Sequence, residues 1–195
     1  MHKHERFLRR CRQRLVMYTV TECTTLPSNF DWLAQQNLAI LEAGTIDWRY
    51  MGNPSTDAEK TSALRSAYTD YLQTDDMSVI EWKKDDFTIQ LSAAVVMPFD
   101  SQYMLFAYAL YGGDSNNSKA WLHDVAYIEQ TRAYVRDTKN LLGFKIACHK
   151  GSSIYNYHMN KSANSSIYEV TEESITVPPD ADDVEVATIR YRYLG

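Results

Sequence analysis

The sequence predicts an α/β protein of the α+β type, with a mixed, largely antiparallel central sheet of six or seven strands flanked by helices. The main observation is that apolar residues recur at strand spacing from 77 to 127. Three runs in this stretch, 79–82, 87–97 and 103–111, are rich in β-branched and aromatic residues. Short polar turns separate the runs, which favours antiparallel pairing as a meander. The length of 195 residues, of which 45% are hydrophobic, suits one domain with a sizeable core.

The chain before this meander predicts one strand and two helices. Residues 17–22 alternate between apolar and polar side chains, as a strand does. Apolar residues at helical spacing then predict helices near 29–43 and 57–74. Each helix follows a pattern that resembles a capping box, in which two side chains bind the free amides of the first turn. These patterns are Ser28 with Asp31, and Thr56 with Glu59.

The chain after the third run predicts a further alternation of strands and helices. A fourth run at 120–128 is expected to join the same sheet, so the meander has three or four strands. A helix, a strand, a shorter helix and two strands follow, which gives the order β-α-α-β-β-β-α-β-α-β-β. Their expected ranges are 129–142, 144–149, 152–162, 166–171 and 184–193.

Charge is distributed unevenly along the chain. Residues 1–16 hold six Lys or Arg and one Glu, a net +5, so the remainder carries −10 of the total −5. We therefore expect a basic N-terminal arm at 1–16 and a single domain at 17–195. An acidic tail at 169–185 has no basic residue. Such asymmetry predicts contacts with other protein subunits, or with a second copy of the chain, through arm residues 2–16 and this tail. A solvated helix or an extension ahead of Met17 remains the alternative for the arm.

Several classes of function are disfavoured by composition. No apolar run is long enough to span a membrane, and no signal-peptide pattern follows the basic start, so we expect a cytoplasmic protein. The acidic body disfavours nucleic-acid binding except through the arm. The three cysteines show no Cys-x-x-Cys spacing and are expected to be inert. No spacing of His, Cys, Asp or Glu predicts a metal site.

The predicted order of elements from Met17 onward resembles the GCN5-related N-acetyltransferase fold. That resemblance implies that an acyl-CoA diphosphate lies on backbone amides between the fourth strand and the third helix. The family pattern Gln/Arg-x-x-Gly-x-Gly/Ala corresponds here to 130–135, which makes Gln130, Arg132 and Ala133 the candidate cofactor-binding residues. Ala133 and Tyr134 replace permissive small residues, which indicates a degenerate site. Gly112-Gly113 is an alternative cradle if the third run is the family's fourth strand.

The same resemblance implies three candidate catalytic residues. Glu129 would be a general base at the open end of the sheet, and Tyr155 or Tyr157 a general acid toward the leaving thiolate. The structural alternative is that Glu129 is an ordinary charge at a helix N-terminus and the tyrosines are packing or interface residues.

Two functions therefore remain open, and the sequence does not decide whether the protein is an enzyme. The first is a structural or interaction component of a larger assembly, such as a bacteriophage virion or assembly protein, on an acetyltransferase-like fold without a cofactor. The second is an active acyl-CoA-dependent N-acyltransferase that uses acetyl-CoA. A phosphate-binding turn distinguishes them, and its degenerate form favours the first.

Overall fold

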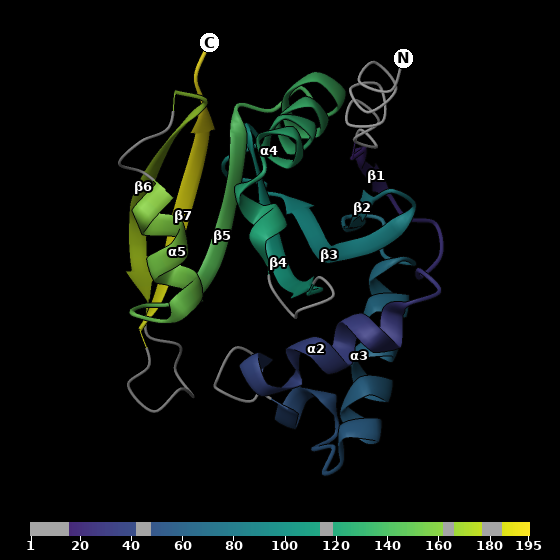
Figure 1. Ribbon diagram of the computed structural model, residues 1–195. Helices are drawn as coiled ribbons and strands as arrows, with labels where there is room; N and C mark the ends of the chain where they lie inside the picture. Colours follow the sequence, from purple (N-terminus) through teal and green to yellow (C-terminus); the bar gives the residue numbers. More distant parts are fainter. Residues whose placement is uncertain (1–15, 42–47, 114–118, 162–165, 177–184) are drawn as a thin grey trace, which may run out of the picture.

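The structure is a computed structural model that describes residues 16–41, 48–113, 119–161, 166–176 and 185–195. A central sheet carries helices on both faces (Figure 1). The element order confirms the predicted β-α-α-β-β-β-α-β-α-β-β topology. In chain order the elements are β1 (Tyr18–Glu22), α2 (Phe30–Ile40), η2 (Trp48–Met51), α3 (Asp57–Tyr71), β2 (Ser78–Lys84), β3 (Phe87–Val96), β4 (Tyr103–Tyr111), η3 (Ala120–His123), α4 (Val125–Arg132), η4 (Ala133–Thr138), β5 (Gly143–His149), α5 (Ser153–Lys161), β6 (Tyr168–Thr176) and β7 (Val186–Tyr193).

The sheet has seven strands in the order β1-β2-β3-β4-β5-β7-β6. Neighbouring strands are antiparallel except β4 and β5, which are parallel. This arrangement confirms the predicted mixed, largely antiparallel sheet. A parallel pair needs a crossover connection, and η3, α4 and η4 provide it between β4 and β5.

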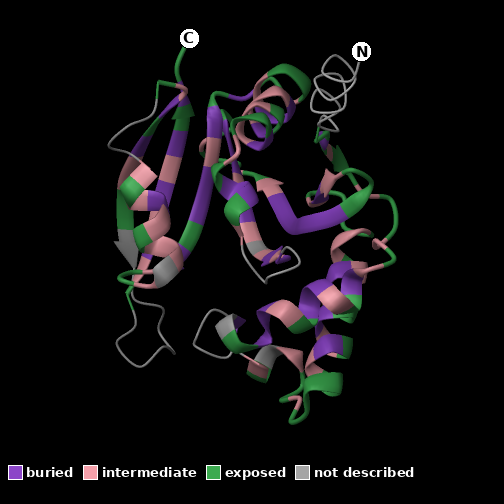
Figure 2. Cartoon of the chain, in the orientation of Figure 1, coloured by how far each residue is buried: buried purple, intermediate pink, exposed green. Residues whose placement is uncertain are grey.

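Two hydrophobic cores lie on the two faces of the sheet. Val79 and Ile80 are neighbours on β2 that belong to different cores, as the alternation of a strand requires. Helices α2 and α3 cover one face, while α4 and α5 cover the other. Figure 2 shows buried residues in purple along the central strands and on the inner sides of these helices.

Only one of the two predicted capping boxes forms. Thr56 accepts the Glu59 amide at 3.2 Å, and the Glu59 carboxylate accepts the Thr56 amide at 3.0 Å, which starts α3. Ser28 and Asp31 form no such box, because α2 begins at Phe30 and the residue before it is Asn29. The Asn29 side chain instead donates to the Thr88 carbonyl on β3 at 2.8 Å.

The predicted strand at 120–128 is wrong, because this segment forms η3 and the start of α4. The Asp124 carboxylate accepts the Ala126 amide at 3.0 Å, which caps a helix that begins at Val125. In addition, the neighbours of β4 in the sheet are β3 and β5, so 120–128 does not supply a strand beside it.

The helix predicted at 129–142 begins earlier and ends earlier. It starts at Val125 and continues past Arg132 with six residues of π-helix to Thr138. Asn140 then adopts φ of 55°, a left-handed conformation that Asn tolerates better than most residues and that turns the chain toward β5.

The predicted acidic tail belongs in part to a paired strand. Its first segment is β6, which extends to Thr176 and lies at the edge of the sheet beside β7. Three of its carboxylates lie near basic side chains of β7 and of the β5 segment. The pairs are Glu169 with Arg192 at 3.9 Å, Glu172 with Lys150 at 3.9 Å, and Glu173 with Lys145 at 2.7 Å and Arg190 at 3.5 Å.

The remaining predictions concern the arm, membranes and cysteines. Arm residues 1–15 lie outside the described residues. None of the described helices is long and apolar enough to cross a membrane. Burial raises the pKa of Cys23 to about 12 and that of Cys148 to about 11, so both thiols stay protonated at neutral pH.

Candidate functional site

The parallel strands β4 and β5 pair over only part of their length. Their register runs from Tyr103 opposite Gly143 to Phe106 opposite Ile146. Beyond this point both strands continue without pairing to each other, to Tyr111 and His149. The strands therefore part toward their C-terminal ends.

A β-bulge lies where the strands part. Leu91 of β3 faces Leu110 of β4, whereas Ala93 faces Ala107, so β4 has one more residue than β3 between these pairs. A bulge bends its strand, and bulges often occur next to active sites. Here the bulge follows Phe106, the last β4 residue paired with β5.

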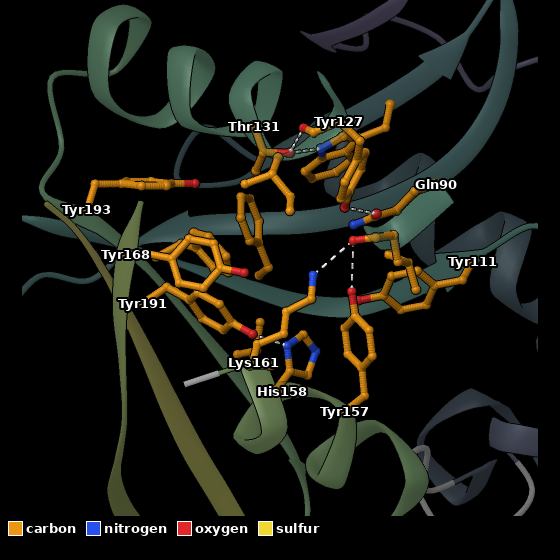
Figure 3. Close-up of a pocket in the computed structure, with 16 residues that line it drawn as sticks. Gln90, Tyr111, Tyr127, Thr131, Tyr157, His158, Lys161, Tyr168, Tyr191 and Tyr193 are labelled. Atoms are coloured by element: carbon orange, nitrogen blue, oxygen red, sulfur yellow. Dashed lines mark hydrogen bonds between the residues drawn. The ribbon is translucent and has the colours of Figure 1, made fainter. Parts of the chain in front are cut away.

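A cavity of about 50 Å³ lies beside this separation, between α4, α5 and the sheet (Figure 3). Its walls are mainly aromatic and aliphatic side chains. The lining residues are Trp82, Gln90, Phe106, Tyr111, Leu122, Tyr127, Ile128, Thr131, Phe144, Ile146, Tyr157, His158, Lys161, Tyr168, Tyr191 and Tyr193.

Two side chains of α5 converge on one carbonyl at the edge of this cavity. The Tyr157 hydroxyl donates to the Leu122 carbonyl at 3.0 Å, and the Lys161 ammonium donates to the same oxygen at 2.9 Å (Figure 3). Burial lowers the pKa of Lys161 to about 8. Burial also raises the pKa of Tyr157, so its hydroxyl keeps its proton at neutral pH.

His158 lies between these two residues in sequence and is more deeply buried, with 8% of its surface exposed. Its Nδ1 is 2.5 Å from the Tyr191 hydroxyl. Its Nε2 has no hydrogen-bond partner among the described residues. Burial, with a smaller contribution from the Lys161 charge, lowers the pKa of His158 to about 3, so the ring is neutral.

The wall formed by α4 and β3 is held by paired polar groups. Tyr127 donates to the Gln90 side-chain oxygen at 2.6 Å. Trp82 donates to the Thr131 hydroxyl at 2.9 Å, and that hydroxyl donates to the Tyr127 carbonyl at 3.0 Å. These satisfied bonds fix the wall opposite Lys161.

The N-terminus of α4 is capped by a carboxylate of the chain itself. One oxygen of Asp124 accepts the Ala126 amide, and the other accepts the Tyr18 hydroxyl at 3.0 Å. A helix N-terminus attracts anions, and here a side chain already supplies the negative charge. A bound diphosphate at this helix end would meet the Asp124 charge.

A second, open hollow of about 640 Å³ adjoins the cavity. Neighbouring residues line the two spaces, since Ile89 and Trp121 line the hollow whereas Gln90 and Leu122 line the cavity. The hollow also has two aromatic rings in edge contact at 5.2 Å and a pair of opposite charges. These residues are Trp32, Phe87, Lys84 and Asp85.

The structure does not bring the three predicted catalytic residues together. Tyr157 lines the cavity, but Glu129 and Tyr155 do not. Glu129 forms an ion pair with Arg132 at 3.2 Å, and the Glu129 side chain is 43% exposed. Tyr155 donates to Glu172 of β6 at 2.5 Å. Only Tyr157 is therefore placed to act in this site.

The predicted cofactor-binding residues do not lie at a helix N-terminus. Gln130 and Arg132 are in the last turn of α4, and Ala133 begins the π-helical segment. Because the third run of the meander is β4, the segment between fourth strand and third helix starts at Gly112 instead. The anion-binding argument therefore does not apply to these three residues, and the alternative cradle at Gly112-Gly113 occupies the corresponding place.

The residues that sequence reasoning missed are His158 and Lys161. They lie three apart on α5, a spacing that places both on one helix face. The only signal for them was that polar and ionisable residues lie next to Tyr157 on a helix that must pack against the sheet. Among the described residues no cluster of His, Cys, Asp and Glu could hold a metal ion.

No family model matches the chain, and no curated protein matches its sequence significantly. Solved structures do match its fold. A spermidine N-acetyltransferase from Vibrio cholerae, in complex with CoA and spermine, has a TM-score of 0.57 at 10% identity, with 90% of this chain and 95% of that chain covered. The ribosomal L7/L12 alpha-N-protein acetyltransferase RimL has a TM-score of 0.56 at 14% identity, with coverage of 92% and 95%.

A putative acetyltransferase of the GNAT family from Desulfovibrio desulfuricans matches with a TM-score of 0.51 at 11% identity, with coverage of 90% and 99%. None of these three is a virion or phage assembly protein, so they lend no support to the virion role expected from the sequence. At such low identity the likeness concerns the fold. The chain has the GCN5-related N-acetyltransferase fold.

Proposed function

We propose that the protein is an N-acyltransferase that takes an acyl group from an acyl-CoA thioester. The observation that carries this proposal is the separation of β4 from β5 at a β-bulge, with a mainly apolar cavity beside it. An acyl chain would enter such a cavity with little loss of hydration. The acetyltransferase fold, matched over 90% and 92% of this chain, supports the same function.

Two residues of α5 would provide the proton transfers. An amine must lose a proton to attack a thioester, and the leaving thiolate must gain one. Lys161, with a pKa of about 8, is partly neutral near physiological pH and could accept the proton. Tyr157 keeps its hydroxyl proton and would stabilise the leaving thiolate by a hydrogen bond, and the thiolate would then take the amine's proton from the Lys161 ammonium. The open hollow beside Trp121 would admit the amine.

The N-terminal end of α4 fits the CoA diphosphate poorly, because the Asp124 carboxylate already lies there. We therefore expect the natural protein to bind acetyl-CoA weakly. Asp124→Ser retains a side chain that caps helices but removes the negative charge. This variant should bind acetyl-CoA about tenfold more tightly, a difference of about 1.4 kcal/mol.

Isothermal titration with acetyl-CoA measures this change. Asp70→Ser, which removes one carboxylate from α3, is the matched control and should bind as the natural protein does. A separate turnover assay then mixes the protein with acetyl-CoA and a mixture of primary amines. Its readout is the release of the free thiol. If Asp124→Ser gains no affinity, the diphosphate does not lie at this helix end. If neither protein binds acetyl-CoA or releases free thiol, the proposed function is wrong.

A non-catalytic interaction protein on the same fold is the second candidate. Asp124 at the helix end favours it, as does the closed edge of the cavity, where Tyr157 and Lys161 both hold the Leu122 carbonyl. Its partners would be protein subunits that contact the basic arm and the β6 edge of the sheet. The absence of acetyl-CoA binding in both the natural protein and Asp124→Ser would favour this function over acyl transfer.

A further inference from the structure

We propose that the cavity between α4 and α5 is a binding site for a small organic carboxylate, with Lys161 as its counter-ion and His158 as a hydrogen-bond donor. The carboxylate is either a free short-chain acid or the far end of an acyl group. The second source rests on the acyltransferase function proposed above but not on Lys161 as its base, because an ammonium paired with the carboxylate cannot accept the amine's proton. The first source rests on neither.

The contrast between a buried lysine, Lys145, and a half-buried lysine, Lys161, supports this site. Lys145 on β5 lies 2.7 Å from Asp100 and 2.7 Å from Glu173. Burial lowers the pKa of Lys145, but the hydrogen bonds to these two carboxylates outweigh burial and raise the pKa above its ordinary value. A buried ammonium is usually paired in this way, because an unpaired buried charge is costly.

The surroundings of Lys161 are different. Its ammonium donates to the Leu122 carbonyl and lies 4.5 Å from the centre of the Tyr157 ring, and no described residue forms an ion pair with it. None of the residues that line the cavity is Asp or Glu. Lys161 is therefore a cation at an aromatic cavity, with a neutral carbonyl where Lys145 has two carboxylates.

His158 gives an independent indication of a ligand. The Tyr191 hydroxyl keeps its proton, because burial raises its pKa, and it lies 2.5 Å from His158 Nδ1. When this hydroxyl donates to Nδ1, the single proton of the neutral ring is on Nε2. A buried N–H without an acceptor is unfavourable, because it has lost the hydrogen bond that water would provide. His158 Nε2 belongs to a residue that lines the cavity and has no described partner, so an acceptor atom of a ligand would satisfy it.

The size and walls of the cavity select the ligand. A volume of about 50 Å³ holds roughly four water molecules, or the end of a chain of a few carbon atoms. Phe106, Phe144 and Ile146 provide apolar walls for methylene groups. A carboxylate has the charge that Lys161 lacks as a partner and the acceptor oxygens that Nε2 lacks. A large aromatic acid would exceed this space, and a phosphate, which has no methylene groups, would leave the apolar walls without a partner.

The first experiment measures binding of sodium butyrate to the natural protein by thermal shift and by isothermal titration at constant ionic strength. Butyramide, which is nearly isosteric but uncharged, is the control probe. We expect a saturable rise in Tm with butyrate at millimolar concentration and none with butyramide. An equal response to both compounds would show that charge plays no part and would overturn the proposal.

Two variants assign the binding to its residues. Lys161→Met keeps the apolar length of the side chain and should weaken butyrate binding at least tenfold, whereas Lys150→Gln removes a positive charge outside the cavity and should leave it unchanged. His158→Gln should weaken binding by a smaller factor. Unchanged affinity in both cavity variants contradicts the site, and if Lys161→Met does not fold, His158→Gln together with the NMR shift of the Lys161 side chain on adding butyrate decides.

The two sources of the carboxylate are distinguished with thioesters. If succinyl-CoA binds at least tenfold more tightly than acetyl-CoA, and Lys161→Met removes the difference, the carboxylate belongs to an acyl donor. If butyrate binds and the two thioesters bind equally or not at all, the ligand is a free acid, and the site stands even where acyl transfer fails. Acetyl transfer without any binding of carboxylates would leave the proposed function standing and overturn this inference.

Discussion

The two faces of the sheet bury different kinds of side chain. The face under α2 and α3 is mainly aliphatic, and its fully buried residues include Phe30, Leu33, Leu64, Leu91 and Leu110. The face under α4 and α5 contains six buried tyrosines, among them Tyr127 and Tyr191, and it carries the cavity. The first face therefore stabilises the fold. The second face is less closely packed and holds buried polar groups that a ligand could contact.

One buried polar residue on each face illustrates the difference. On the aliphatic face, Asn37 is 1% exposed and fully used, with its amide bound to the Leu33 and Tyr111 carbonyls and its oxygen bound to the Tyr111 amide. On the tyrosine face, His158 retains a buried nitrogen without a described partner. Buried polar groups are normally satisfied, but Thr61 Oγ1 on α3 and Trp48 Nε1 also have no described partner, so what distinguishes His158 is that it lines the cavity.

A matched pair of truncations gives the largest expected change in stability and tests the difference between the two faces. Leu33→Ala, at 0% exposure in the aliphatic core, should lower the free energy of unfolding by about 4 kcal/mol. Leu122→Ala, beside the cavity on the other face, should lower it by about 2 kcal/mol, because its side chain already borders empty space. Urea unfolding with constant m-values measures both, and equal costs would show that the faces pack alike.

Acid unfolding tests the buried histidine. The pKa of His158 is lowered to about 3, against about 6.5 in an unfolded chain, so the unfolded state takes up a proton that the folded state does not. Stability should therefore fall as pH decreases from 6.5 toward 3, by about 3 kcal/mol at pH 4 from this residue. His158→Gln should remove that contribution, and His149→Gln on β5 is the control. Parallel pH profiles for the natural protein and His158→Gln would show that the ring is already charged or exposed.

The smallest expected effect belongs to a local contact that is independent of both faces. Thr56→Ala removes the side chain that caps α3 and should cost about 1 kcal/mol. Phe99→Ala, at a side chain that is fully exposed at 101%, should change stability by less than about 0.5 kcal/mol. Chemical denaturation measures both. A Thr56→Ala cost as large as that of Leu33→Ala would mean that α3 is held by its cap instead of by the core.

The sequence by itself determined the elements whose causes are local. Alternating apolar residues place β2, β3 and β4, and the reciprocal side-chain bonds of Thr56 and Glu59 start α3, because these signals lie within a few residues of each other. The same local logic misassigned 120–128, where the bond of Asp124 favours a helix and the strand beside β4 is β5.

Only the tertiary structure decided what belongs to the site. The separation of β4 from β5 depends on strands that are joined by a crossover, and the pairing of Glu173 with Lys145 joins residues far apart in sequence. The convergence of Lys161 on the Leu122 carbonyl is likewise a long-range contact, as is that of His158 on Tyr191. Periodicity and capping report short-range geometry, whereas a cavity and the charges that face it are set by which elements the whole fold brings together.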